Sequence, residues 1–123
     1  MRILGFSKKW DKLKQDTFTT FRYPRRDRDW EIGEQVRIVY KPRSKDREIL
    51  GVAKIINKEL RKIATAYEQY KPTEIEAQAD GFDNLFQMNA WFRDTYGSRI
   101  FEEPMNKLTL MPLNTDKRIE VIG

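Results

Sequence analysis

Apolar and polar residues alternate in several short stretches of the chain, which is the pattern of β-strands with one buried face. The alternation is clearest at residues 35–40, where Val36, Ile38 and Tyr40 form the apolar face. A longer extended run contains Gly51, which indicates a β-bulge or the close approach of another segment. The pattern predicts five strands, at residues 2–6, 17–23, 35–40, 48–63 and 106–111, and residues 114–123 form either a further edge strand or a tail.

Helical periodicity replaces this alternation in the second half of the chain. Thr73 begins a sequence with capping-box spacing, which predicts a helix that ends near Gly81. Asn84 begins a second helix with the same spacing, and that helix ends at Gly97. A single helical turn is expected within residues 7–16. The aromatic residues of the second helix are expected to lie in the core: Phe86, Trp91 and Phe92.

The order of these elements is strands, then two helices, then a closing strand. Such an order favours a small curled sheet or barrel whose helices cover one opening. We therefore expect an α+β fold in which about five to six mixed strands form a small β-barrel flanked by two to three helices. A chain of 123 residues fits one domain, so we expect residues 1–123 to form a single domain with its core at about residues 2–113.

Composition excludes several kinds of chemistry. The chain contains no cysteine and no histidine, which rules out disulfides, Cys/His metal sites and histidine-based triads. Catalysis would have to use carboxylate, lysine, hydroxyl, tyrosine or arginine groups, and we expect neither a cofactor nor a metal. No apolar run approaches the roughly 20 residues needed to cross a bilayer, and charge appears too early for a secretory signal. We expect a cytoplasmic protein without a membrane segment.

Charge is distributed unevenly along the chain. Residues 1–62 contain 18 Lys and Arg against 9 Asp and Glu, whereas residues 63–123 contain 6 against 10. The basic half indicates one positive face that attracts an anionic partner. The alternative is that the lysines serve only solubility. The acidic half, with its aromatic helix, is a candidate surface for a protein partner.

The basic half contains a stretch, residues 17–30, in which four arginines lie among threonines and aromatic residues. Guanidinium groups bind phosphate bidentately and aromatic faces stack on bases, so this stretch is typical of a nucleotide or nucleic-acid site. Thr20 and Arg22 lie on one face of the predicted strand. Arg22 either binds a phosphate or base edge beside Thr20, or it pairs with Asp80 in a structural role. Tyr23 is the candidate stacking residue, and Trp30 is more typical of the core.

Two loops supply further positive charge. Arg25 and Arg26 follow Pro24 in the first loop, where they either contact phosphates or are neutralised by neighbouring carboxylates. The second loop places four positive residues close together, and the two loops would form one backbone-tracking groove if they share a face. These four residues are Lys41, Arg43, Lys45 and Arg47.

Several short motifs, taken in order, resemble those of the ASCH (activating signal cointegrator homology) domain, a family with a PUA-like fold. The resemblance implies a small β-barrel flanked by helices, with a cleft near the early strands and a role in RNA binding. Some proteins of similar fold hydrolyse N4-acetylated cytidine. The motifs that carry the resemblance are Ile3-Leu4-Gly5-Phe6 with Trp10, Thr20-Phe21-Arg22, Trp30-Glu31-Ile32-Gly33-Glu34, Asp80-Gly81-Phe82 and Met105-Asn106-Lys107-Leu108.

The family signature has the form Gly-x-Lys-x-x-Thr-x-Arg. Aligned on Arg22, it places Thr20 on the family threonine and Thr17 where the lysine stands. In the hydrolase members a lysine activates the threonine and a carboxylate completes the set, and Asp80 falls near that position. Lys12 and Lys14 are the lysines outside the motif that could replace the missing one. The resemblance therefore implies an RNA- or nucleotide-binding module, with a small amidohydrolase using Thr20 and Asp80 as the alternative.

Overall fold

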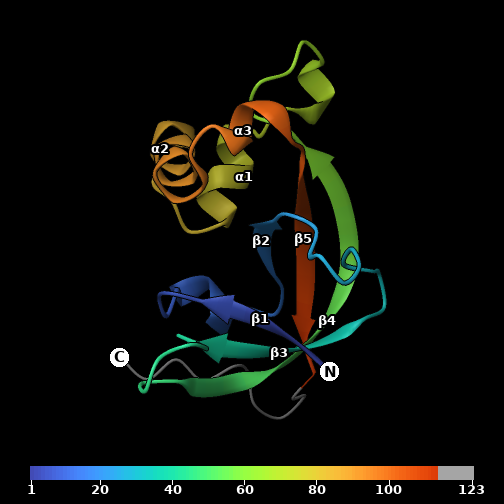
Figure 1. The fold of residues 1–123 in the computed structure, drawn as a ribbon, viewed down its shortest axis with the longest axis vertical. Coiled ribbons are helices and arrows are strands. Elements are labelled where there is room, and N and C mark those ends of the chain that lie inside the picture. Colours follow the sequence, from blue (N-terminus) through green and yellow to red (C-terminus); the bar gives the residue numbers. More distant parts are fainter. Residues whose placement is uncertain (114–123) are drawn as a thin grey trace.

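Five strands form one mixed sheet in the order β1-β3-β4-β5-β2 (Figure 1). The computed structural model describes residues 1–113, so the expected tail or edge strand at 114–123 lies outside the described residues. β1 is parallel to β3, and the other neighbouring strands are antiparallel. All five predicted strands are confirmed: β1 (Arg2–Phe6), β2 (Phe18–Arg22), β3 (Gln35–Tyr40), β4 (Glu48–Arg61) and β5 (Met105–Pro112).

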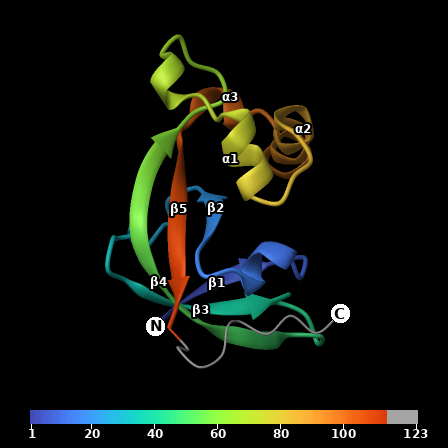
Figure 2. The ribbon, with the colours of Figure 1, turned by 180° about the vertical axis from the view of Figure 1, so that it is seen from behind.

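β4 determines the curvature of the sheet. This long strand pairs with β3 through its first part and with β5 through its second part (Figure 2). The register shifts at Leu50, next to Gly51, and again at Ile56, and β-bulges of this kind bend and twist a strand. The expected barrel is therefore a five-stranded half-barrel within the described residues, and β1 and β2 are its two edges. We call the opening between these two edges the seam.

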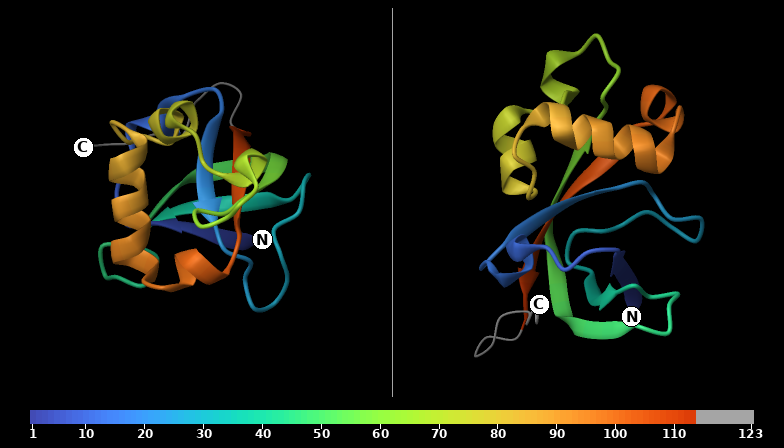
Figure 3. Two further views of the ribbon diagram at one scale, coloured as in Figure 1. Left: turned by 90° about the horizontal axis from the view of Figure 1, so that it is seen from above. Right: turned by 90° about the vertical axis from the view of Figure 1, so that its left-hand side faces the viewer.

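The helices gather at one end of the half-barrel, and α2 lies across that end (Figure 3). The predicted capping box is confirmed, because Thr73 Oγ1 accepts from the Glu76 N–H at 3.1 Å and Glu76 Oε1 accepts from the Thr73 N–H at 3.0 Å. A short helix after Gly97 was not predicted. The helices are α1 (Glu74–Ala79), α2 (Leu85–Tyr96) and α3 (Arg99–Glu102), with 3-10 turns η1 (Asp11–Lys14) and η2 (Glu68–Tyr70).

The buried apolar side chains form two clusters. One fills the half-barrel and includes Phe6 and Phe18, and the other packs the helices against β2 and β5 and includes Phe21. Phe92 is buried in the second cluster as predicted, and Trp30 is buried in the first. The predicted burial of Phe86 and Trp91 is wrong: these side chains are 77% and 39% exposed. Met88 and Phe92 occupy the core-facing stripe of α2, and Phe86 and Trp91 lie off this stripe.

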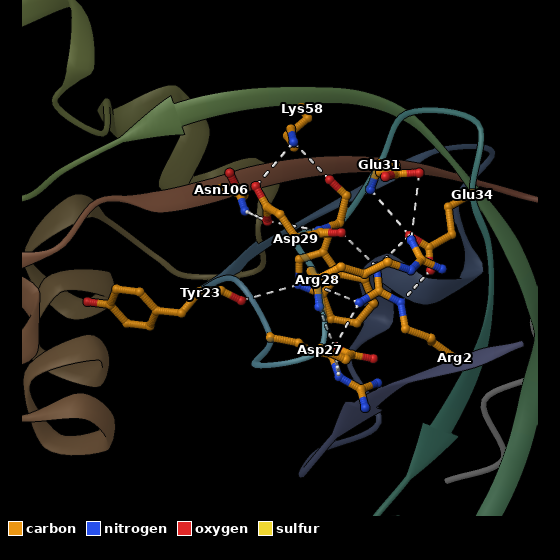
Figure 4. Close-up of polar contacts among 11 residues, drawn as sticks. Arg2, Tyr23, Asp27, Arg28, Asp29, Glu31, Glu34, Lys58 and Asn106 are labelled. Carbon is orange, nitrogen blue, oxygen red and sulfur yellow. Dashed lines mark hydrogen bonds and ion pairs between the residues drawn. The ribbon is translucent and has the colours of Figure 1, made fainter.

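Arg2, the first residue of β1, makes hydrogen bonds that hold the loop between β2 and β3 (Figure 4). Its guanidinium donates to both carboxylate oxygens of Glu34 at 2.6 Å, and to the carbonyls of Arg28 and Asp29 at 2.7 and 2.9 Å. It also lies 4.4 Å from the centre of the Trp30 ring. The hydrogen bonds from Arg2 hold the pKa of Glu34 below its usual value. This nearly buried pair positions the loop from which Arg25 projects.

Replacing Arg2 by alanine should lower the free energy of unfolding by about 3 kcal/mol, because Glu34 would be left as a nearly buried charge without its main partner. Urea denaturation followed by circular dichroism measures this loss. Arg93→Ala, at an exposed position on α2, is the matched control and should change stability by less than about 0.5 kcal/mol. Equal stability of the two variants would show that the Arg2–Glu34 pair does not hold the loop.

Candidate functional site

Two adjoining hollows lie along the seam between β1 and β2, and they share Gly5, Arg22 and Tyr96 in their walls. The inner hollow has a volume of about 220 Å³ and reaches toward η1, α1 and α2. The outer hollow has a volume of about 480 Å³ and opens toward the two basic loops. Predicted site residues therefore converge here from β2, from the loops and from the end of α1.

Lys12 and Asp80 form an ion pair in the wall of the inner hollow. Lys12 Nζ lies 3.2 Å from Asp80 Oδ1, and the two residues are only 5% and 4% exposed. Thr19 Oγ1 donates to the same carboxylate oxygen at 3.0 Å. Burial lowers the pKa of Lys12 to about 8 although Asp80 opposes the shift, and burial raises the pKa of Asp80. At neutral pH this lysine is therefore close to its titration range.

Arg22 stands where the two hollows meet. Its Nε donates to Thr20 Oγ1 at 3.0 Å, and its guanidinium lies 4.6 Å from the centre of the Phe6 ring. Among residues 1–113 no carboxylate lies within ion-pairing distance of Arg22, since Asp80 pairs with Lys12 instead. Burial lowers the pKa of Arg22. The structural alternative, in which Arg22 pairs with Asp80, is thus absent from the described residues, and Arg22 lines both hollows.

The outer hollow joins the two basic loops on one face of the fold. Arg25 from the first loop and Arg43 and Arg47 from the second line it together with Arg22. Gly5 permits this approach, because a Cβ at that position would lie 2.7 Å from Pro42 Cγ. The backbone of the second loop is also tied to β1, since the Lys41 N–H donates to the Phe6 carbonyl at 2.8 Å. The described wall of the outer hollow contains no carboxylate.

Arg99 completes the wall of the outer hollow and was not predicted as a site residue. It begins α3, and its guanidinium lies 3.9 Å from the centre of the Tyr23 ring while pairing with Glu103. A single arginine after Gly97 carries no signal in the sequence. Only the packing of α3 beside the end of β2 brings Arg99 to the seam.

Tyr23 lines the outer hollow, but its ring belongs to the second apolar cluster. The side chain is 8% exposed. Its ring centre lies 5.0 Å from that of Tyr96 in an edge-to-face arrangement, and the Arg99 guanidinium lies over its face. Figure 4 shows the ring pointing away from Arg2 and toward the helices. Tyr23 therefore offers no free face for a base, which corrects the stacking role expected for it.

The remaining predicted residues lie outside these two hollows. Arg26 and Lys45 are exposed and line neither of them, and Lys41 lines a neighbouring hollow with Arg43. In the first loop, Arg25 Nε lies 3.5 Å from Asp27 Oδ1, and Arg28 pairs with Glu31 and Glu34, so this part of the loop is locally neutralised, as the alternative expects.

The inner hollow contains a lysine, although the family motif places threonine at the lysine position. Thr17 is exposed and lines neither hollow. The lysine is Lys12, which belongs to η1. The residue after it, Leu13, is fully buried in the first apolar cluster. Lys12, Thr20 and Asp80 therefore line one cavity, a combination that the spacing of the motif alone did not predict.

Comparisons of this chain with protein-family models, with curated proteins and with solved structures find no match. Within residues 1–113 no group of three carboxylate residues is placed to hold a metal ion. In the same part of the chain, no helix combines the length and the apolar character needed to cross a membrane.

The pKa of the Lys12 ammonium should be directly measurable by following its ¹³Cε resonance against pH. We expect a midpoint near 8, against about 10.4 for an unperturbed lysine side chain. Because the unfolded chain binds this proton more tightly, the contribution of Lys12 to stability should rise between about pH 8 and 10.5 and vanish in Lys12→Met. A midpoint above 10 would contradict the lowered pKa expected from the burial of Lys12.

Proposed function

We propose that this chain is a binding module for RNA or a nucleotide, and that the ligand occupies the two hollows of the seam. The observation that carries this proposal is Arg22, a guanidinium without a carboxylate partner among the described residues, at the junction of the two hollows. An unpaired, partly buried cation is costly, and an anionic ligand supplies the missing partner. The resemblance to ASCH domains and their PUA-like fold supports the same proposal.

The chemistry of the two hollows suggests how such a ligand lies. The outer hollow is lined by five arginines, which suit phosphate groups because each guanidinium presents a fork of N–H donors. The inner hollow has aromatic walls from Trp10 and Trp91 together with the Lys12–Asp80 pair, so it offers apolar surface, a donor and an acceptor to a base. The phosphates therefore point outward along the arginines and a base points inward.

Binding should weaken steeply with salt, because neutralised phosphates release counterions. We expect Arg43→Ala/Arg47→Ala to weaken the affinity for a single-stranded RNA of about ten nucleotides by about tenfold. The same change should flatten the slope of log K against log salt by about 1.4, measured by fluorescence anisotropy between about 50 and 200 mM salt.

Both arginines are exposed on a loop, so the double variant should keep the fold. Arg93→Ala, which removes an exposed arginine that lines neither hollow, is the matched control and should bind RNA as the wild type does. Salt-independent binding, or unchanged affinity in the double variant, would contradict the proposal.

A second candidate function is hydrolysis of an N4-acylated cytidine, and the observation that favours it is Lys12 in the same cavity as Thr20 and Asp80. A lysine whose pKa is about 8 can accept the proton of a threonine hydroxyl near neutral pH. Thr20 Oγ1 would attack the acyl carbonyl, the amine would leave, and water would then release the acid from the threonine ester. Asp80 would act as a positioning residue for the Lys12 ammonium.

Chromatography of N4-acetylcytidine incubated with the protein tests this alternative. Turnover that is lost in Thr20→Ala and Lys12→Met but kept in Lys14→Met would support it, because Lys14 lies in the same η1 turn and is exposed. Turnover that survives in Lys12→Met would contradict the role given to Lys12. No turnover by the wild type would leave binding as the function of the seam.

A further inference from the structure

The outer side of α2 carries an aromatic groove with a volume of about 440 Å³, which we call the α2 groove. Phe86 and Trp91 line it and are 77% and 39% exposed. Exposed aromatic surface of this kind is unfavourable in water and marks a site of interaction. Phe86 lines neither hollow of the seam, so the function proposed above does not account for it.

The floor of the α2 groove is rigid. Trp10, Phe82 and Trp91 pack on one another with ring centres 5.2 to 6.0 Å apart, and Phe82 also contacts buried Phe92. Gly81 has a positive φ of 107°, and a Cβ there would lie 2.9 Å from the Trp10 ring. Because backbone and rings are held in place, the groove exists before a partner binds, which reduces the entropic cost of binding.

The charges in the α2 groove specify the kind of partner. Asp83 and Asp94 both line it, one before and one after Phe86 in the sequence. Lys8 also lies in the groove, with its ammonium 4.3 Å from the centre of the Trp10 ring. A lysine of the chain itself thus makes one contact that the groove offers, a cation over an aromatic face.

We propose that the α2 groove docks a basic segment of a partner protein. An apolar or aromatic side chain of that segment packs against Phe86 and Trp91, and flanking lysine or arginine residues pair with Asp83 and Asp94. The two carboxylates repel a phosphate backbone, which separates this surface from the arginine-lined outer hollow. The chain then carries two binding surfaces of opposite charge, one for an anionic ligand and one for a basic protein segment.

Selection of random peptides displayed on phage against the immobilised full chain tests this proposal. We expect the enriched peptides to combine lysine or arginine with a large apolar residue. Calorimetry with the synthesised peptides should show affinity weakened about tenfold or more by Phe86→Ala, and about threefold by Asp83→Asn/Asp94→Asn. Neither variant should change RNA affinity, because Asp83, Phe86 and Asp94 line neither hollow.

Matched controls are available on the same molecule. Phe101→Ala removes an exposed phenylalanine of α3 outside the α2 groove, and Asp46→Asn removes an exposed carboxylate of the second basic loop. Both should bind the peptides as the wild type does. Enriched peptides without basic residues, or with equal affinity for Phe86→Ala, would overturn the proposal. Weaker RNA binding by Phe86→Ala would also overturn it, because RNA would then occupy the groove. Sedimentation of the wild type as a dimer that Phe86→Ala abolishes would overturn it as well, because a second copy of the chain would then occupy the groove.

Discussion

The bending of β4 is the constraint on which the rest of the structure depends. One strand pairs with both β3 and β5, and its bulges at Leu50 and Ile56 let it turn from one partner to the other. The sheet curls as a result, but β1 and β2 remain its two edges within the described residues. The seam between them is therefore a consequence of sheet curvature, and both hollows of the candidate site follow its length.

The charged groups buried at the seam differ in whether a partner of opposite charge compensates them. Two cations, Lys12 and Arg22, approach one carboxylate, Asp80, in a region with little exposure to water. Removing charge from water is costly unless a partner compensates, and Asp80 compensates Lys12. Arg22 is left without an ion-pair partner in residues 1–113, so local positive charge exceeds negative charge where the two hollows join. Elsewhere, the Arg2–Glu34 pair is complete and holds a loop.

Local features of the sequence predicted the elements of this fold well. Alternation at residues 35–40 and the capping box at Thr73 act over a few residues, so they do not depend on what the chain packs against. Gly51 correctly indicated a bulge, because a residue without a side chain is favoured where a strand bends. The predicted burial of Phe86 and Trp91 was wrong because it depends on tertiary packing. The position of the sheet decides which side of α2 meets the core.

The sequence by itself determined the strands, the helix starts, the absence of cysteine and histidine chemistry, and the arginines beside Thr20, because these follow from residue type and short-range spacing. Only the tertiary structure decided which charges meet. Lys12 pairs with Asp80, which lies more than sixty residues away in the sequence, Arg99 lines the outer hollow with Arg25 and the second basic loop, and Tyr23 lies in the core. Such pairings depend on how the curled sheet brings distant segments together, and spacing along the chain carries no information about that distance.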